Sequence, residues 1–256
     1  MIDDVLSRYI SHATAHEPEY PIVDGKPVRA SWAGMCSRAV GFRVAQVPVD
    51  LERTVQTAIA FAVGDAIHDV ICDALAWAFD GERETAASLG QCGVHVDVSW
   101  WADGLRHSTE VKSMQPFAFD SSVRGVKDAP PEGPRWSHLL QAAIGATAIG
   151  ADVMHLIYAD KAAGRVHEWS WSRDDMIPDA FGGEVAWPTA AANEVSRLED
   201  AYLLASQGNA PLPLVPGYGL VDDPPAKGTR GAPWQCRWCD WQPSCVRIGP
   251  EGGLLR

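Results

Sequence analysis

The chain has 256 residues, 46% of them hydrophobic, which is enough for one large domain or two small ones with a buried core. It has no apolar run of about 18 residues and no signal-like N-terminus, so we expect a soluble, cytoplasmic protein without membrane partners. The net charge of −12 argues against non-specific coating of nucleic acid, because such binding depends mainly on neutralised phosphates. This charge still allows a local basic groove, for which the candidates are Arg38, Arg43, Arg124, Lys127, Lys227, Arg230, Arg237 and Arg247.

The N-terminal third of the chain is predicted to be mainly helical. Residues 1–35 combine a short amphipathic start with a proline-rich segment, and Cys36 follows at the predicted start of a short helix. Asp50 is the predicted N-cap of a long helix that ends at about Phe79, because apolar residues recur along it with helical spacing. Considered alone, Cys36 near the start and His68 on the long helix are either buried core residues or ligands.

Residues 93–113 are predicted to form a β-hairpin. Apolar and polar residues alternate along its first half, and the Asp-Gly pair at 103–104 is typical of a two-residue turn in which both residues have positive φ. With that turn, positions whose numbers add up to about 207 face each other across the two strands. This register predicts that Asp97 faces Glu110, with Lys112 on the same face of the hairpin.

Two opposed carboxylates repel each other, so their placement opposite each other needs an explanation. One reason is a divalent cation such as Mg²⁺ or Mn²⁺, which prefers hard oxygen ligands and can polarise a phosphate and activate water. Lys112 would then orient the nucleophilic water or stabilise charge on the phosphate. The alternative is a solvated hairpin face that carries these charges without a function.

The remaining elements complete a predicted α/β chain with a mixed sheet. Residues 114–135 are rich in proline, glycine and charge, which predicts an irregular loop beside the active site. A helix is expected over residues 136–149, and its Gln141 is either a site residue or a polar surface residue. The pattern further predicts strands at 153–158 and 165–171 and a last long helix within 189–207. This order of elements fits a single domain.

A cysteine motif lies near the C-terminus, where Cys236, Cys239 and Cys245 follow the pattern C-x2-C-x5-C. A structural zinc or an iron–sulfur cluster normally takes four thiolates, so the fourth would come from elsewhere. The other cysteines are Cys36, Cys72 and Cys92. Because nothing in the sequence suggests secretion, a metal or cluster site is a better explanation than a disulfide framework.

Together, these motifs resemble a RecB-like nuclease of the PD-(D/E)XK superfamily. Their order and spacing are similar to its iron–sulfur branch, which includes CRISPR-associated adaptation nucleases, phage-encoded exonucleases and the AddB nuclease domain. The motifs that carry the resemblance are Cys36 with Arg38, the helix with Gly64 and His68, Asp97 with Glu110-Val111-Lys112, Gln141, and the C-terminal cysteines. The resemblance spans nearly the whole chain, from Cys36 to Cys245, and implies a restriction-endonuclease-like core with helices flanking a mixed central sheet.

By this resemblance, a structural 4Fe-4S cluster held by four cysteines would join the N- and C-terminal segments of one nuclease domain over residues 1–256. Its ligands would be Cys36, Cys236, Cys239 and Cys245, although four thiolates also suit zinc. The resemblance implies that His68, Asp97, Glu110 and the carbonyl of Val111 hold Mn²⁺ or Mg²⁺. Lys112 would be the catalytic lysine, and Gln141 matches a glutamine of the branch. Relatives usually have a tyrosine four residues later, where this chain has Gly145. Cys72 and Cys92 match nothing in the family pattern, and we expect them to be structural.

The implied function is a metal-dependent DNA exonuclease that prefers single-stranded ends. It would act in the cytoplasm, or in the host cytoplasm if phage-encoded, as a homo-oligomer or with a separate helicase or recombination partner. The first alternative is a catalytically silent DNA-binding or adaptation-complex subunit that keeps the nuclease fold. The second is a zinc-stapled protein with no nucleic-acid role, which the acidic charge favours.

Overall fold

The computed structural model describes residues 25–49, 54–126, 129–179 and 183–209, together with Cys239, Trp241 and Cys245. The helices are η1 (Ala30–Trp32), α2 (Ser37–Val44), α3 (Val55–Phe79), α4 (Pro116–Val123), α5 (Trp136–Ala148), α6 (Trp187–Leu204) and the π-helical turn η2 (Ala205–Asn209). The strands are β1 (Val28–Arg29), β2 (Glu82–Leu89), β3 (Cys92–Ala102), β4 (Leu105–Met114), β5 (Val153–Asp160), β6 (Val166–Ser172), β7 (Met176–Pro178) and β8 (Glu184–Ala186). No helix in the described part of the chain is long and apolar enough to cross a membrane.

The chain divides into two compact units. One comprises residues up to 34 together with 53–195, and it includes the whole large sheet. The other comprises residues 35–52 and those from 196 onward, and it includes the cysteines of the predicted cluster site. The single nuclease domain expected over residues 1–256 stays a prediction, because contacts within a structure do not show which parts fold alone.

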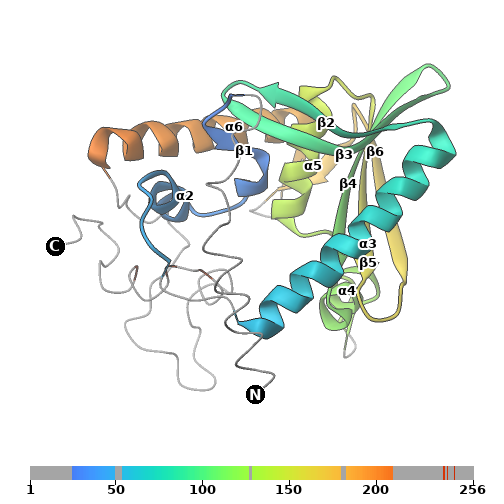
Figure 1. Ribbon diagram of the computed structural model, residues 1–256. Coiled ribbons are helices and arrows are strands. Elements are labelled where there is room, and N and C mark those ends of the chain that lie inside the picture. The colour runs from blue at the N-terminus through green and yellow to red at the C-terminus, as the bar shows by residue number, and fades with distance from the viewer. Residues whose placement is uncertain are drawn as a thin grey trace. The chain divides into compact units, whose positions relative to one another are not determined.

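Six strands form the large mixed sheet, in the order β1-β3-β4-β5-β6 with β2 also paired to β3 (Figure 1). β1 runs parallel to β3 and β4 runs parallel to β5, whereas the other neighbours are antiparallel. β7 and β8 form a separate antiparallel pair. The prediction of a mixed α/β fold with a central sheet flanked by helices is therefore confirmed.

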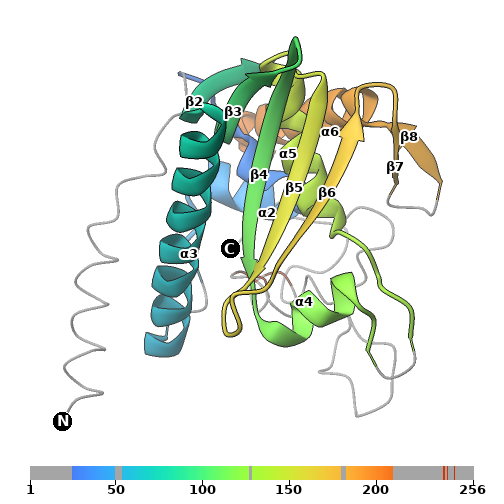
Figure 2. The ribbon, with the colours of Figure 1, turned by 90° about the vertical axis from the view of Figure 1, so that its right-hand side faces the viewer.

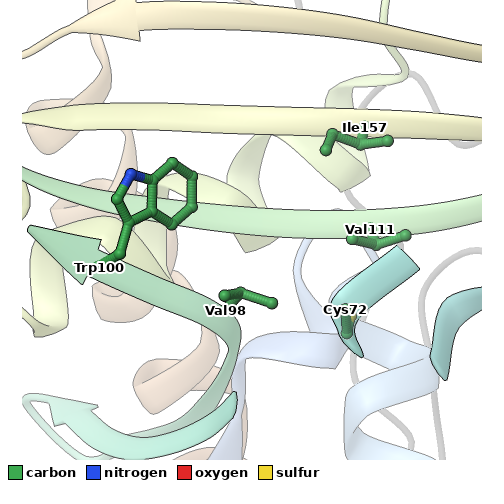
Figure 3. Packing of buried hydrophobic residues seen from close by; sticks show 5 residues of the cluster. All are labelled: Cys72, Val98, Trp100, Val111 and Ile157. Carbon is green, nitrogen blue, oxygen red and sulfur yellow. The ribbon is translucent and has the colours of Figure 1, made fainter. Parts of the chain in front are cut away.

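Helices α3 and α5 cover opposite faces of the sheet (Figure 2). Ile157 of β5 belongs to a buried apolar cluster with Cys72 of α3. The next residue, Tyr158, points the other way, because its hydroxyl lies 2.8 Å from Nδ1 of His138 on α5. Figure 3 shows the cluster on the α3 side, which consists of Cys72, Val98, Trp100, Val111 and Ile157. The middle of β4 is thus enclosed between two helices.

The predicted hairpin is formed by β3 and β4. Five residue pairs, from Val98–Thr109 to Ala102–Leu105, follow the expected register, in which the two residue numbers add up to about 207. Asp103 and Gly104 have φ angles of 52° and 79°, as a turn with two left-handed residues requires. Both the register next to the turn and the turn itself are confirmed.

The start of the long helix differs from the prediction. α3 begins at Val55, and the hydroxyl of Thr54 accepts a hydrogen bond from the N–H of Thr57. The cap predicted at Asp50 is therefore wrong, because Thr54 satisfies a backbone N–H of the first turn.

The segment after the hairpin also differs from the irregular loop that was predicted. Residues 116–123 form α4, with Pro116 in the first turn, where its missing N–H and fixed φ fit a helix. β2 was not predicted either, although it pairs antiparallel with β3 along most of its length. The other predicted helices and strands are present within a few residues of their expected limits.

Candidate functional site

The sheet is interrupted around Asp97. β2 pairs with one edge of β3 over residues 92–99, so β1 and β4 share the other edge. β1 pairs at residues 92–93 and β4 at residues 98–102, which leaves residues 94–97 of that edge between the two partners. The pairs formed with β2 also skip Asp97. Asp97 therefore lies where the ladder is broken on both sides.

The interruption changes which face of β3 carries the apolar residues. Val94 and Val96 lie against Gly145 of α5, whereas Val98 and Trp100 pack in the cluster on the α3 side. The alternation read from the sequence is thus not continuous through Asp97. An added Cβ on Gly145 would lie 3.3 Å from Val96 Cγ2, so a larger residue here would require the Val96 side chain to shift.

The Asp97 carboxylate occupies the break in the ladder. Its Oδ2 accepts a 2.7 Å hydrogen bond from the N–H of Val111 and lies 3.1 Å from Nε2 of His68 on α3. The N–H and C=O of a strand residue point toward the same neighbouring strand, so the Val111 carbonyl faces the same break. Three residues predicted to belong to the site therefore meet at one point, and their roles as ligands stay predictions.

Glu110 and Lys112 lie on the opposite face of β4 from Val111, toward α5. Glu110 is 3% exposed and forms an ion pair with Lys112. Burial, followed by the negative charge of Asp97, raises the pKa of Glu110 to about 7 against the opposing effect of Lys112. Burial lowers the pKa of Lys112, but the charges of Glu110 and Asp97 outweigh it and hold that pKa above its usual value.

The predicted opposition of Asp97 and Glu110 is realised electrostatically but not as a ladder pair. The two residues are next in register after Val98–Thr109, where the pairing of β3 with β4 ends. The negative charge of Asp97 nevertheless adds to the effect of burial in raising the pKa of Glu110. Two carboxylates that are both less than about a tenth exposed form an unfavourable pair that a cation would relieve.

His68 and Cys72 face the break from successive turns of α3. The hydrogen bond with Asp97, and then that with Cys72, raises the pKa of His68 to about 10. Sγ of Cys72 lies 3.6 Å from Nε2 of His68. Burial raises the pKa of the Cys72 thiol, although His68 opposes this effect. The ligand atoms of His68, Cys72 and Asp97 all lie within 4.8 Å of one another.

Cys72 is thus the residue at this point that the sequence reading missed. It is fully buried, as expected for a structural cysteine, but it also borders the candidate site. Its position four residues after His68 places both side chains on one helix face, and this spacing was the signal available in the sequence.

A pocket of about 180 Å³ opens beside Asp97. Gln141 of α5 lines it, so the structure brings this predicted site residue next to the break in the sheet. Its other lining residues were not predicted as site residues, apart from Asp97 itself: Arg29, Ala30, Ser31, Glu84, Gly93, Val94 and His95. Most of them come from β1, η1 and β2, which are short or lack a clear apolar alternation.

The donor set at the break fits a divalent cation. His68 offers an imidazole nitrogen 3.1 Å from a carboxylate oxygen of Asp97, and the buried Glu110 and the carbonyl of Val111 are the other predicted ligands. Oxygen-rich sets with an imidazole suit Mn²⁺, and all-oxygen positions suit Mg²⁺. The burial of both carboxylates on neighbouring strands favours a cation at this point.

The three described cysteines of the predicted cluster site lie in one apolar group in the second compact unit. Cys245 and Trp241 form this group with Ala39 and Phe42 of α2, and Cys36 and Cys239 pack against it. Cys36 is the N-cap of α2, which confirms its predicted place at the start of a short helix. Cys236 lies outside the described residues. None of the described cysteines forms a disulfide.

Arg38 does not belong to a DNA-facing groove, for which it was a candidate. Its side chain is fully buried, and Nη1 donates a 3.3 Å hydrogen bond to Sγ of Cys245. Burial raises the pKa of the Cys36 thiol, whereas Arg38 lowers it. The Arg38 guanidinium thus opposes the effect of burial at Cys36, and thiolates are the ligands of zinc and of iron–sulfur clusters. These residues therefore fit a metal or cluster without distinguishing between the two.

Comparison with known proteins shows the fold. No family model and no curated protein matches the chain. Among solved structures, the crystal structure of SSO0001 matches over 96% of this chain and 96% of its own, with a TM-score of 0.50 and 14% sequence identity. The two chains share a fold.

A weaker likeness is found to the alkaline exonuclease LHK-Exo from Laribacter hongkongensis. Its crystal structure matches over 73% of this chain and 94% of its own, with a TM-score of 0.39 and 14% identity. The structure of LHK-Exo in complex with dAMP has the same coverage and TM-score, with 12% identity.

Proposed function

We propose that the protein is a metal-dependent DNA nuclease with a restriction-endonuclease-like core, and specifically an exonuclease that acts on single-stranded ends. The observation that carries this proposal is the Asp97 carboxylate, held between His68 and the backbone of Val111 and close to the buried Glu110–Lys112 pair. The order of these residues along the chain also resembles that of the RecB-like nucleases.

His68, Asp97, Glu110 and the carbonyl of Val111 would hold the Mn²⁺ or Mg²⁺ ion. When bound, such an ion neutralises charge on a phosphate and lowers the pKa of a water. The chain's part is to hold its two carboxylates together in spite of their repulsion, with His68 on one side and Lys112 on the other. Site rigidity follows from burial, since Asp97 is 8% exposed and Glu110 is 3% exposed.

Lys112 has two roles in this proposal. In the structure it neutralises Glu110, which would otherwise be a buried, unpaired carboxylate. With a cation to neutralise Glu110, the Lys112 ammonium would be available to position the nucleophilic water and to stabilise charge on the phosphate. Its pKa above the usual value means that it carries this positive charge at neutral pH. Gln141, which lines the adjacent pocket, would contact the DNA.

We further propose that Cys36, Cys236, Cys239 and Cys245 bind a structural 4Fe-4S cluster. The gathering of Cys36, Cys239 and Cys245 around Phe42 and Trp241, and the hydrogen bond from buried Arg38 to Cys245, support this proposal. Iron analysis and the visible absorption of anaerobically purified protein test it. A colourless protein that contains one zinc and no iron would instead favour a zinc staple.

The nuclease proposal is tested with Asp97→Asn and Lys112→Ala, assayed on end-labelled single-stranded DNA with Mn²⁺. Both variants should lose at least about 100-fold in cleavage rate, because each removes a charge that acts on the transition state. Asp103→Asn is the matched control for Asp97→Asn, since Asp103 lies in the exposed turn of the same hairpin at positive φ, which asparagine tolerates. The control should cleave like the wild type.

Unchanged cleavage by Lys112→Ala would exclude its catalytic role. If the wild-type protein binds both DNA and Mn²⁺ but fails to cleave DNA with any divalent ion, it would instead be the silent subunit of the alternative proposal.

A further inference from the structure

The candidate metal site contains a thiol that the nuclease reaction does not require. Cys72 Sγ lies 3.6 Å from His68 Nε2, which in turn lies 3.1 Å from Asp97 Oδ2, and all three ligand atoms lie within 4.8 Å of one another. They come from two elements, α3 and β3, that are packed against each other in the same compact unit. The three side chains thus converge on one small volume.

Two of the three separations between these atoms are close to those of a tetrahedral zinc site. Zinc binds nitrogen and carboxylate oxygen at about 2.0–2.2 Å and sulfur at about 2.3 Å, so in a tetrahedron its ligands are about 3.3–3.7 Å apart. The separation of Cys72 and His68 falls within this range, and that of His68 and Asp97 is slightly shorter. One imidazole, one thiol and one carboxylate with a fourth position left for water form a set that zinc accepts and that Mg²⁺ does not.

Cys72 and Glu110 approach His68 and Asp97 from opposite sides of the sheet. Cys72 packs against Val111 on the α3 side, as Figure 3 shows. Glu110, the preceding residue in β4, points toward α5. An ion drawn toward Cys72 therefore lies on the far side from Glu110, whereas an ion held by Glu110 lies away from the thiol. A hard cation would bind His68 and Asp97 together with Glu110, whereas a softer cation would bind the same two residues together with Cys72.

We propose that His68, Cys72 and Asp97 form a zinc-binding mode that competes with the Mn²⁺ or Mg²⁺ mode and holds the nuclease inactive. The inhibitory role rests on the proposed nuclease function, whereas zinc binding does not. In the zinc mode, Glu110 remains paired with Lys112, so neither residue is available for catalysis. Zinc would thus inhibit the nuclease because it binds the thiol of Cys72 in preference to the buried carboxylate of Glu110.

The test measures both metals on the full-length protein, purified anaerobically so that any metal at the other cysteines is common to all variants. Mn²⁺ binding is followed by electron paramagnetic resonance, and Zn²⁺ binding by competition with a chromophoric chelator. The variants are Cys72→Ser and Glu110→Gln, with Cys92→Ser as the control, because Cys92 is an equally buried cysteine outside the site. Circular dichroism shows whether each variant is folded.

The expected result is a crossed pattern. Cys72→Ser should weaken Zn²⁺ binding at this site at least about 100-fold, since loss of an outer-shell partner alone costs 10- to 100-fold. Its Mn²⁺ affinity should stay within about two-fold of wild type. Glu110→Gln should do the reverse, and Cys92→Ser should change neither affinity. In the wild type, one equivalent of Zn²⁺ should release the bound Mn²⁺.

Zn²⁺ affinity that is unchanged in Cys72→Ser would overturn the inference and leave the nuclease proposal intact. If Cys72→Ser does not fold, Zn²⁺ that binds the wild type without releasing Mn²⁺, once the four-cysteine site is already occupied, would overturn it equally. Failure of the nuclease proposal looks different, because Mn²⁺ would then support no DNA cleavage even though the zinc measurements could still show the crossed pattern.

Discussion

Replacing His138 with glutamine should remove part of the acid sensitivity of the protein. The hydroxyl of Tyr158 accepts a 2.9 Å hydrogen bond from the N–H of Arg135 and lies 2.8 Å from Nδ1 of His138. The hydroxyl proton is therefore available for His138, which must be unprotonated at Nδ1 to accept it. Burial, and then the positive charges of Lys112 and Arg135, lower the pKa of His138 from 6.5 to about 3.

The sign and size of the effect follow from this lowered pKa. Below about pH 6.5 the unfolded chain takes up a proton at His138 and the folded chain does not, so acid favours unfolding. Each pH unit below that value costs about 1.4 kcal/mol, and the cost levels off near the folded pKa of about 3. Between about pH 7.5 and about pH 5.5, this one residue should remove about 1.4 kcal/mol from the free energy of unfolding.

The assay is urea unfolding of the wild type and of His138→Gln at these two pH values. The glutamine carbonyl can still accept the hydroxyl hydrogen of Tyr158 and does not titrate, so the variant should lose about 1.4 kcal/mol less than the wild type. The loss in the free energy of unfolding between the two pH values is compared between the two proteins, so the contributions of the other titrating groups cancel. Equal losses in the two proteins, within about 0.3 kcal/mol, would refute the reasoning.

Two further predictions concern backbone conformation and the cysteine site. Gly34→Ala should destabilise the protein more than Gly104→Ala. Both glycines have positive φ, so an alanine is strained at either position. A Cβ on Gly34 would in addition lie 2.6 Å from Cβ of Ser137, whereas a Cβ on Gly104 would meet nothing within 4 Å. Gly104→Ala should cost about 1–2 kcal/mol and Gly34→Ala about 1–3 kcal/mol more in urea unfolding, and equal costs would contradict this account. Arg38→Gln should lower the iron content and visible absorption of the purified protein, because it weakens the hydrogen bond to Cys245. Arg43→Gln is its control, and equal iron loss in both variants would argue against a specific role for Arg38.

The hairpin could be predicted from the sequence because its information is local. The alternation along β3 and the Asp103–Gly104 turn determine which residues face each other, and the structure follows that register to Val98–Thr109. The helices α3 and α5 could be predicted for the same reason, since apolar residues recur along them at helical spacing. The start of α3 was misplaced because Asp50 and Thr54 are both good caps and the sequence does not rank them.

The break at Asp97 could not be predicted, because it depends on three partners of β3 that are distant or inconspicuous in sequence. β1 contributes only two residues, and β2 has no clear apolar alternation. Where β1 and β4 divide one edge of β3 between them, the ladder opens and the carboxylate of Asp97 can reach His68 and Val111. The same geometry brings Cys72 to the site, although the sequence had suggested only a structural role for it.

The measurement that tests the central proposal most directly is a crystal structure of the protein with Mn²⁺ bound. We expect one ion at about 2.0–2.3 Å from His68 Nε2, a carboxylate oxygen of each of Asp97 and Glu110, and the carbonyl oxygen of Val111. In that structure, Lys112 should no longer form an ion pair with Glu110. An ion bound elsewhere on the chain, with Glu110 still paired to Lys112, would contradict the proposed metal site.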